Sequence, residues 1–124
     1  MGEAWGNLLV AVMHGLAEIM VRAVRDLYAD CLSSLPGLIE RGDPAALHFY
    51  FANFVGMRRK LAPALFAAYE GWLATGDVRV IETAATEGLV RWRATSEELL
   101  DLHAVRGDAV AAQIEARLDP RVKC

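Results

Sequence analysis

The amino-acid sequence predicts an all-α domain, an antiparallel bundle of five to six helices, and three observations lead to this prediction. Alanine, leucine, arginine and glutamate dominate the 124-residue chain, and all four are good helix formers. Apolar residues recur at steps of three and four over long stretches, which is the helical period. The dipeptide Gly-Asp separates apolar stretches at three places. Hairpin dipeptides and sustained apolar/polar alternation, the usual strand signals, are missing.

A Gly-Asp pair predicts a tight corner between two antiparallel helices. The glycine can adopt the left-handed conformation that ends one helix. The aspartate can accept hydrogen bonds from the free N–H groups that begin the next helix. Pro44 follows the first pair at the initial helical position, where proline has no hydrogen bond to lose. The three pairs are Gly42-Asp43, Gly76-Asp77 and Gly107-Asp108.

The helices follow in order between these corners. The first is predicted over residues 3–32, and a short second helix begins with Ser34 as its cap and ends at Gly42. Pro63 either kinks one long helix or separates two. The remaining helices are predicted over 44–61, 63–75, 78–105 and 109–118. The apolar stripe of the first helix comprises Leu9, Val12, Met13, Leu16, Ile19, Met20, Ala23 and Leu27.

The composition is that of one globular domain spanning residues 1–124. Hydrophobic residues make up 55% and charged residues 23%, enough for a core and a charged surface. The net charge of −3 and the scattered basic residues argue against direct nucleic-acid binding, because phosphate contacts need a basic face. No apolar stretch approaches the roughly 20 residues of a membrane span. We therefore expect a cytoplasmic protein in which Cys31 and Cys124 stay reduced.

The common catalytic motifs are missing from the sequence, and we expect neither enzymatic activity nor a cofactor. There is no glycine-rich phosphate loop, no zinc-protease histidine pair, no Cys-x-x-Cys and no nucleophile elbow. His48 and His103 are predicted to face inward and His14 outward. Two inward histidines could share a metal or a ligand. The alternative, which we favour, is two hydrogen-bonded helix histidines, so no metal site is predicted.

A small-molecule site is suggested by one stripe of the helix predicted over 44–61. Tyr50, Phe51 and Phe54 lie on this stripe, and a further step of four reaches Arg58. A guanidinium binds carboxylates through two parallel hydrogen bonds, so Arg58 would suit the carboxylate of an apolar acid. The alternatives are that Arg58 extends into solvent at the helix end or pairs with an internal carboxylate.

The helix predicted over 78–105 completes this candidate site. Trp92 and His103 fall on its inward stripe, and the small residues Ala85 and Gly88 leave room beside them. Glu70, Glu97 and Glu98 are the internal carboxylates that could compete for the arginine. The predicted ligand-binding residues are Arg58, Tyr50, Phe51, Phe54, Trp92 and His103.

Three segments carry a family resemblance. The run from Leu99 to Ala112 places Gly107-Asp108 between leucines and small residues, Tyr69 to Trp92 contains a second Gly-Asp corner, and Leu35 to Phe54 contains the first. These segments resemble the ligand-binding (FCD-type) domain of GntR-family transcription regulators. The resemblance implies an all-helical, dimeric, effector-sensing domain that is normally attached to a winged helix-turn-helix. This chain would then be a stand-alone or truncated sensor.

The metal site of that family is not carried over. Many members hold a metal with one aspartate and three histidines, but the matching positions here are occupied by Glu97 and Asp119. The aspartate–histidine pair is also displaced, because Asp43 and His48 stand five residues apart.

Two functions remain open from the sequence. The first is a small-molecule-sensing regulatory domain that works as a homodimer and binds an apolar acid. The second is a protein–protein interaction or dimerisation module without a ligand pocket. A closed apolar cavity near Arg58 would favour the first, and a large exposed apolar face would favour the second. The positive mean hydropathy of +0.25, with Trp5, Leu8 and Val10 expected on the surface of the first helix, predicts the homodimer.

Overall fold

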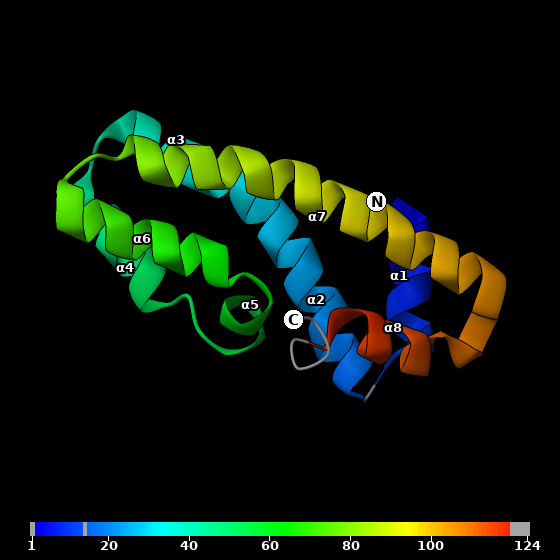
Figure 1. The fold of residues 1–124 in the computed structure, drawn as a ribbon. Helices are drawn as coiled ribbons and strands as arrows, with labels where there is room; N and C mark the ends of the chain where they lie inside the picture. The colour runs from blue at the N-terminus through cyan, green and yellow to red at the C-terminus, as the bar shows by residue number, and fades with distance from the viewer. Residues whose placement is uncertain (1, 14, 120–124) are drawn as a thin grey trace.

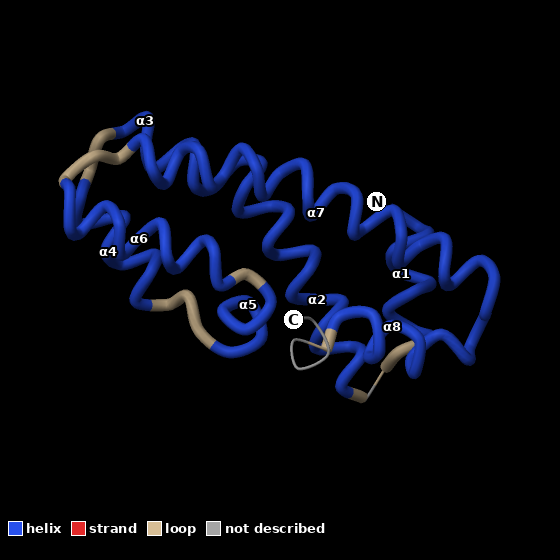
Figure 2. Tube along the Cα trace, in the orientation of Figure 1, coloured by secondary structure: helices blue, strands red, loops and turns tan. Residues whose placement is uncertain are grey.

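The longest helix, α7 (Arg79–Arg106), runs along the whole bundle and organises it (Figure 1). In a computed structural model of the chain, residues 2–13 and 15–119 are described. These residues form only helices and short loops, with no strand among them (Figure 2). The predicted all-α bundle is therefore confirmed. The other elements are α1 (Gly2–Ala11), α2 (Leu16–Ala29), the π-helical segment η1 (Asp30–Ser34), α3 (Leu35–Arg41), α4 (Pro44–Ala52), α5 (Gly56–Leu61), α6 (Pro63–Thr75), the 3-10 segment η2 (Gly107–Ala109) and α8 (Val110–Leu118).

The helices group at the two ends of α7. The α3, α4 and α6 helices lie towards its first turns, whereas α1 and α8 lie towards its last turns (Figure 1). The α2 helix crosses the bundle between these groups, and α6 packs antiparallel along α7. Within the described residues, no helix combines the length and the apolar character that crossing a bilayer requires.

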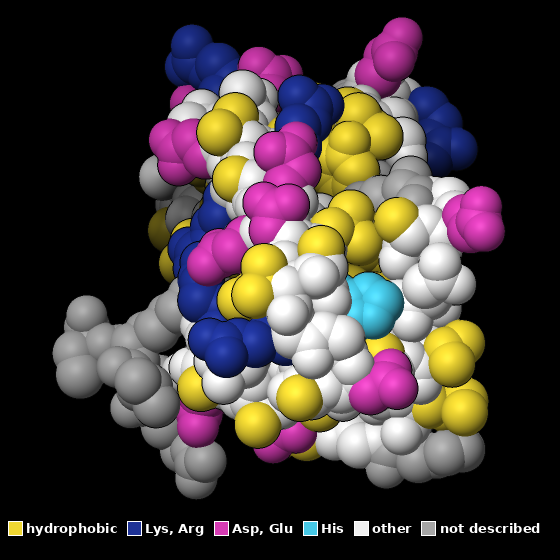
Figure 3. Space-filling model, turned by 90° about the vertical axis from the view of Figure 1, so that its right-hand side faces the viewer, with side chains coloured by type: hydrophobic (Ala, Val, Ile, Leu, Met, Phe, Trp, Pro, Cys, Tyr) yellow, Lys and Arg dark blue, Asp and Glu magenta, His cyan; other side chains and the backbone are white. Residues whose placement is uncertain are grey.

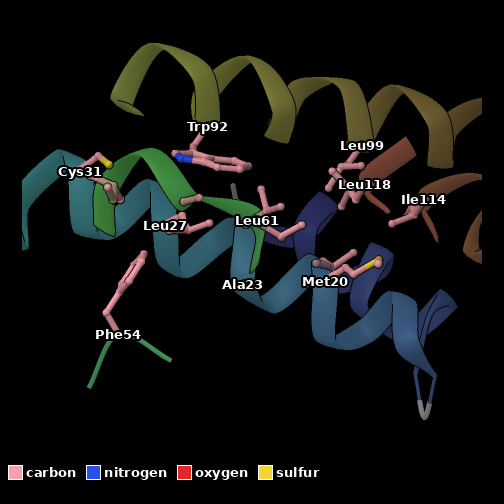
Figure 4. Close-up of a cluster of buried hydrophobic side chains, with 14 of the residues drawn as sticks. Met20, Ala23, Leu27, Cys31, Phe54, Leu61, Trp92, Leu99, Ile114 and Leu118 are labelled. Carbon is pink, nitrogen blue, oxygen red and sulfur yellow. The ribbon is translucent and has the colours of Figure 1, made fainter. Parts of the chain in front are cut away.

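The core forms along one stripe of α7 because its buried residues recur at steps of three and four. Trp92 points from α7 into the interior, where Leu27 and Leu61 approach it (Figure 4). The hydroxyl group of Ser96 donates to the carbonyl oxygen of Trp92 at 2.7 Å, so this buried polar group is satisfied within the helix. The buried stripe of α7 comprises Ile81, Ala85, Gly88, Trp92, Thr95, Ser96 and Leu99.

The closest approach between two elements occurs where η1 crosses α7. A Cβ atom built on Gly88 would lie 2.6 Å from the Sγ atom of Cys31, so any larger residue at this position would force the Cys31 side chain or α7 to shift. Burial and the neighbouring charge of Asp30 raise the pKa of Cys31 to about 12. The thiol therefore stays protonated at neutral pH and packs as a small apolar group.

Two of the three predicted corners are confirmed in full or in part. Gly42 and Gly76 end α3 and α6 in the left-handed conformation, with φ of 64° and 72°. The Asp43 carboxylate accepts hydrogen bonds from the N–H groups of Ala45 and Ala46 at 3.0 and 3.4 Å. The carboxylate of Asp77 accepts one hydrogen bond from the N–H group of Arg79, at 3.0 Å.

The third corner differs from the prediction. Gly107 has a positive φ of 58°, but its ψ of −134° lies outside the left-handed helical region. Asp108 lies inside η2, and neither η2 nor α8 has a side-chain cap. The chain turns here through a 3-10 segment, so the predicted aspartate cap of the last helix is wrong.

The helix boundaries also need correction. The predicted helix over 3–32 is divided between Ala11 and Leu16, and η1 then joins α2 to α3 without the predicted Ser34 cap. The predicted helix over 44–61 is divided between α4 and α5. The prediction for His14 lies outside the described residues.

The break after α1 changes which apolar side chains are exposed. Trp5 and Leu8 are buried, with 4% and 0% exposed, although both were expected on the surface. Conversely, Met13 and Ile19 of the predicted apolar stripe are 53% and 54% exposed. The reason is that α1 and α2 are separate helices, so one helical period cannot run through both.

The corner aspartates provide a test of local stability. Asp43→Ala removes both cap hydrogen bonds of α4, and we expect it to lower the free energy of unfolding by about 0.5–2 kcal/mol. Asp108→Ala is the control, because Asp108 does not cap α8. Urea denaturation of the two variants measures the difference, and equal midpoints would contradict the cap at Asp43.

The crossing of η1 and α7 provides a second test. Gly88→Ala gains helix propensity of up to about 1 kcal/mol, but overpacking against Cys31 costs about 1–3 kcal/mol. We therefore expect a lower melting temperature, which Cys31→Ala in the same chain should partly restore. Gly71→Ala in α6 is the control, because its Cβ would meet Val80 at an ordinary 3.7 Å. Gly88→Ala as stable as Gly71→Ala would contradict the tight crossing.

Candidate functional site

Three of the aromatic side chains that were predicted to line a ligand site, Tyr50, Phe51 and Phe54, lie together at the core. Phe51 and Phe54 are buried, with 2% and 0% exposed. The ring of Phe51 stacks on the ring of Tyr69 in α6, with centroids 4.5 Å apart. The ring of Tyr50 meets Phe51 edge-on at 4.9 Å. These contacts are between protein side chains, as expected of a packed aromatic cluster.

Arg58 does not continue the aromatic stripe. Asn53 to Val55 break the helix, and α5 begins at Gly56 with a positive φ of 66°. The guanidinium instead turns back over the ring of Phe54, with its central carbon 5.4 Å from the ring centroid.

The partner of Arg58 is a carboxylate of the protein. Its Nη1 atom donates to the Oδ2 atom of Asp30 at 2.7 Å, and its Nη2 atom donates to the carbonyl oxygen of Asn53 at 2.9 Å. The hydroxyl group of Tyr50 donates to the same Asp30 oxygen at 2.7 Å. The Asp30 and Arg58 side chains are 13% and 24% exposed, so the ion pair is largely shielded from water.

The electrostatics of this network keep Tyr50 a hydrogen-bond donor. Burial is the largest cause that raises the pKa of Tyr50, and the negative charge of Asp30 raises it further. The phenol therefore stays neutral and holds its proton towards the carboxylate. Arg58 is already neutralised, and an acid ligand would have to displace Asp30 to bind it.

Sequence reasoning missed Asp30, although it considered Glu70, Glu97 and Glu98 as partners. Asp30 stands 28 residues before Arg58, within a segment predicted to be an ordinary helix. The one available signal was a carboxylate between the apolar residues Leu27 and Leu32. Such a residue is either solvated or paired, because a buried charge needs a partner.

The predicted histidines lie at opposite ends of the bundle. His48 is on α4, where its Nδ1 atom is 3.0 Å from the hydroxyl oxygen of Tyr69 and its ring lies 4.8 Å from that of Trp72. His103 is half-buried in the last turns of α7, at the other end (Figure 1). Between 2–13 and 15–119, no three potential metal ligands come together.

Trp92 is buried, with 3% exposed, and it borders a crevice between α7 and the α5–α6 segment. The crevice consists of two adjoining hollows of about 150 and 250 Å³, and both are lined by Arg91 and Trp92. Neither hollow is lined by Arg58, by His103 or by the aromatic residues Tyr50, Phe51 and Phe54. The structure thus separates Trp92 from the rest of the predicted ligand site.

A larger groove lies on the other side of the crossing between η1 and α7. Its volume is about 500 Å³, and η1 and α3 form one wall while α7 forms the other. Leu32 is 49% exposed at this groove. The lining residues are Cys31, Leu32, Pro36, Ile39, Glu40, Glu82, Ala85, Thr86 and Leu89.

The fold and these surfaces define an all-α bundle with an apolar interhelical groove. Residues 1–121 match the profile of a family described as a family of unknown function (DUF6866), C-terminal domain, and the chain belongs to this family. No curated protein and no solved structure matches the chain. The resemblance to GntR-family ligand-binding domains stays a prediction.

The Asp30–Arg58 pair yields a further prediction. Arg58→Met leaves a shielded carboxylate without its cation, and Asp30→Asn leaves the guanidinium without its anion. We expect each variant to lose about 1.5–3 kcal/mol of unfolding free energy, and the double variant to lose less than the sum. Chemical denaturation measures these values.

Arg79→Met is the control for this experiment, because the Arg79 side chain is 82% exposed in its ion pair with Asp77. We expect a much smaller change there, since exposed ion pairs contribute little. If Arg58→Met cost no more than Arg79→Met, Arg58 would be free to hold a ligand and the structural role assigned to it would be wrong.

Proposed function

We propose that this domain is a protein–protein interaction module whose groove between α3 and α7 receives an amphipathic helix with basic flanks. The observation behind this proposal is the groove itself, an apolar hollow of about 500 Å³ with a carboxylate on each wall. The alternative hypothesis is a small-molecule site in which Arg58 binds a carboxylate. In the structure, Arg58 donates a hydrogen bond to Asp30 instead.

The floor of the groove is suited to apolar side chains. Cys31 and Ala85 are buried beneath it, whereas Leu32 is exposed and Ile39 and Leu89 are half-buried. A partner that covered Leu32, Ile39 and Leu89 would remove their apolar surface from water, which stabilises a complex by roughly 25 cal/mol per Å².

The negative charge on the rim of the groove suggests that the partner is basic. Glu40 lies on α3 and Glu82 on α7, both are exposed, and both line the groove. Neither carboxylate forms a salt bridge with a described residue. Lysine or arginine on either side of an apolar stripe would complement this rim, and such complementarity favours encounter and specificity.

The length of the groove supports a helix as the proposed occupant. From Glu82 to Leu89 its α7 wall extends about 10 Å, at roughly 1.5 Å per residue. That length accommodates two turns of a helix lying between α3 and α7. Amphipathic helices bind grooves of this kind through residues at helical spacing.

The opposite end of the bundle has a different surface. Where α7 meets α8, hydrophobic, acidic and basic side chains lie side by side (Figure 3). Val105 in this region is 78% exposed and provides a matched exposed apolar residue outside the groove.

The proposal predicts selective binding of a basic helix. The probe is a fluorescent amphipathic peptide of leucine and lysine, compared with one in which glutamate replaces lysine. We expect the lysine peptide to bind more tightly, and Leu32→Asp to weaken it by at least about tenfold, or 1.4 kcal/mol. Val105→Asp should bind like the unmodified protein. Fluorescence anisotropy measures both affinities.

Charge reversal tests the rim separately. The double variant Glu40→Lys/Glu82→Lys should prefer the glutamate peptide. Equal effects of Leu32→Asp and Val105→Asp would contradict the groove as the binding surface. A groove that instead covers a second copy of the chain would appear as a dimer in light scattering that Leu32→Asp dissociates, and this result would replace the proposed basic partner.

A further inference from the structure

The crevice beside Trp92 combines an apolar floor with two cations. Its smaller hollow, of about 150 Å³, lies between α5 with the start of α6, α7 and α8. The side chains of Lys60 and Arg91 are both exposed at this hollow. Its other lining residues are Leu61, Pro63, Trp92, Thr95 and Leu118.

We propose that this hollow binds a small aromatic carboxylate. The ring lies against Trp92, Leu61 and Leu118, and the carboxylate is held by Lys60 and Arg91. This site is independent of the groove proposed above, because the hollow and the groove share no lining residue.

The volume of the hollow fits a single ring. An apolar cavity of about 150 Å³ in another protein is known to hold benzene, and this hollow has the same size. Leu61, Trp92 and Leu118 are 7%, 3% and 3% exposed, so they form a fixed apolar surface. A longer acyl chain would have to enter the neighbouring hollow.

The two cations are available for a ligand. Neither Lys60 nor Arg91 forms a salt bridge with a described residue, whereas Arg58 is paired with Asp30. The guanidinium carbon of Arg91 lies 5.1 Å from the ring centroid of Trp92, so the protein already holds this charge over the indole. An arginine in this position can donate two parallel hydrogen bonds to a carboxylate.

The neighbouring hollow explains why the anion should bind at the Lys60 end. That hollow is also lined by Arg91 and Trp92, but it contains Glu87 and lacks Lys60. The carboxylate of Glu87 would repel a bound anion there. The acid is therefore oriented with its charge towards Lys60 and away from Glu87.

The hydroxyl group of Thr95 does not compete for the ligand. It donates to the carbonyl oxygen of Arg91 at 2.8 Å, which satisfies it within α7. The indole N–H of Trp92 belongs to the ring that lines the hollow. This group therefore provides a spectroscopic probe that a ligand in the crevice would perturb.

Benzoate and benzamide are the probes, because they share a ring and differ in charge. With isotope-labelled protein, we expect benzoate to shift the indole N–H resonance of Trp92 in a saturable manner, and benzamide to do so far more weakly. Arg91→Gln should weaken benzoate binding by about tenfold, and Lys60→Gln by several-fold. Arg93→Gln is the control, because Arg93 is an exposed cation on α7 that lines neither hollow beside Trp92.

Three results would overturn the site: no saturable shift with benzoate, equal affinities for benzoate and benzamide, or equal affinities of Arg91→Gln and Arg93→Gln for benzoate. Circular dichroism of each variant confirms that it remains helical, and folding of the Lys60, Arg91 and Arg93 variants is expected because these side chains are exposed. Binding that Arg58→Met abolishes while Arg91→Gln leaves it intact would place the acid at Arg58 instead.

Discussion

The contact between Cys31 and Gly88 is the constraint on which the arrangement of the other helices depends. It brings the side chain of Cys31 in η1 so close to the backbone of α7 that a Cβ atom at position 88 would clash with the sulfur. The same contact separates the surface beside α7 into two regions. Cys31 lines the groove on one side, whereas Gly88 lines the larger hollow beside Trp92 on the other. A change in this crossing would therefore alter the groove and the larger hollow beside Trp92 together.

The other side of η1 is held in place by the charged side chain of Asp30. Asp30 precedes Cys31 in η1, but its carboxylate faces Tyr50 and Arg58 and thereby ties η1 to α4 and α5. Two consecutive residues thus attach η1 to two different parts of the bundle, one through van der Waals packing and the other through hydrogen bonds to a shielded ion. Removing either attachment leaves a cavity or an unpaired charge, which are the two common causes of large losses in stability.

Local chemistry in the sequence was sufficient for the helical class and for the corners at Gly42 and Gly76, because glycine conformation and helical period depend on neighbouring residues. It was insufficient where contacts between residues far apart in the sequence determine the position of a side chain. The loop from Asn53 to Val55 has no proline to mark it, and the helical period alone placed Arg58 on the aromatic stripe. Its true partner, Asp30, becomes a neighbour only after the chain has folded back. Trp92 was correctly placed on the inward stripe of α7. One of the two cations beside it, Lys60, comes from α5, and no pattern of neighbouring residues predicts that α5 packs there.

The π-helical geometry of η1 determines where the chain from α2 to α3 tolerates the loss of a residue. A π-helical turn closes each backbone hydrogen bond over five residues rather than four, so the widened turn of Asp30–Ser34 takes up one extra residue. The α3 helix therefore keeps nearly the rotation about the axis that a regular α-helix one residue shorter would give it. The α-helical part of α2 has no such turn, and deleting one residue there would rotate α3 by about 100°. Leu35, now fully buried, would leave the core, and α3 would no longer present Pro36 and Ile39 to α7. The loss of one residue is thus absorbed at η1, whereas the same loss within α2 would displace one wall of the groove.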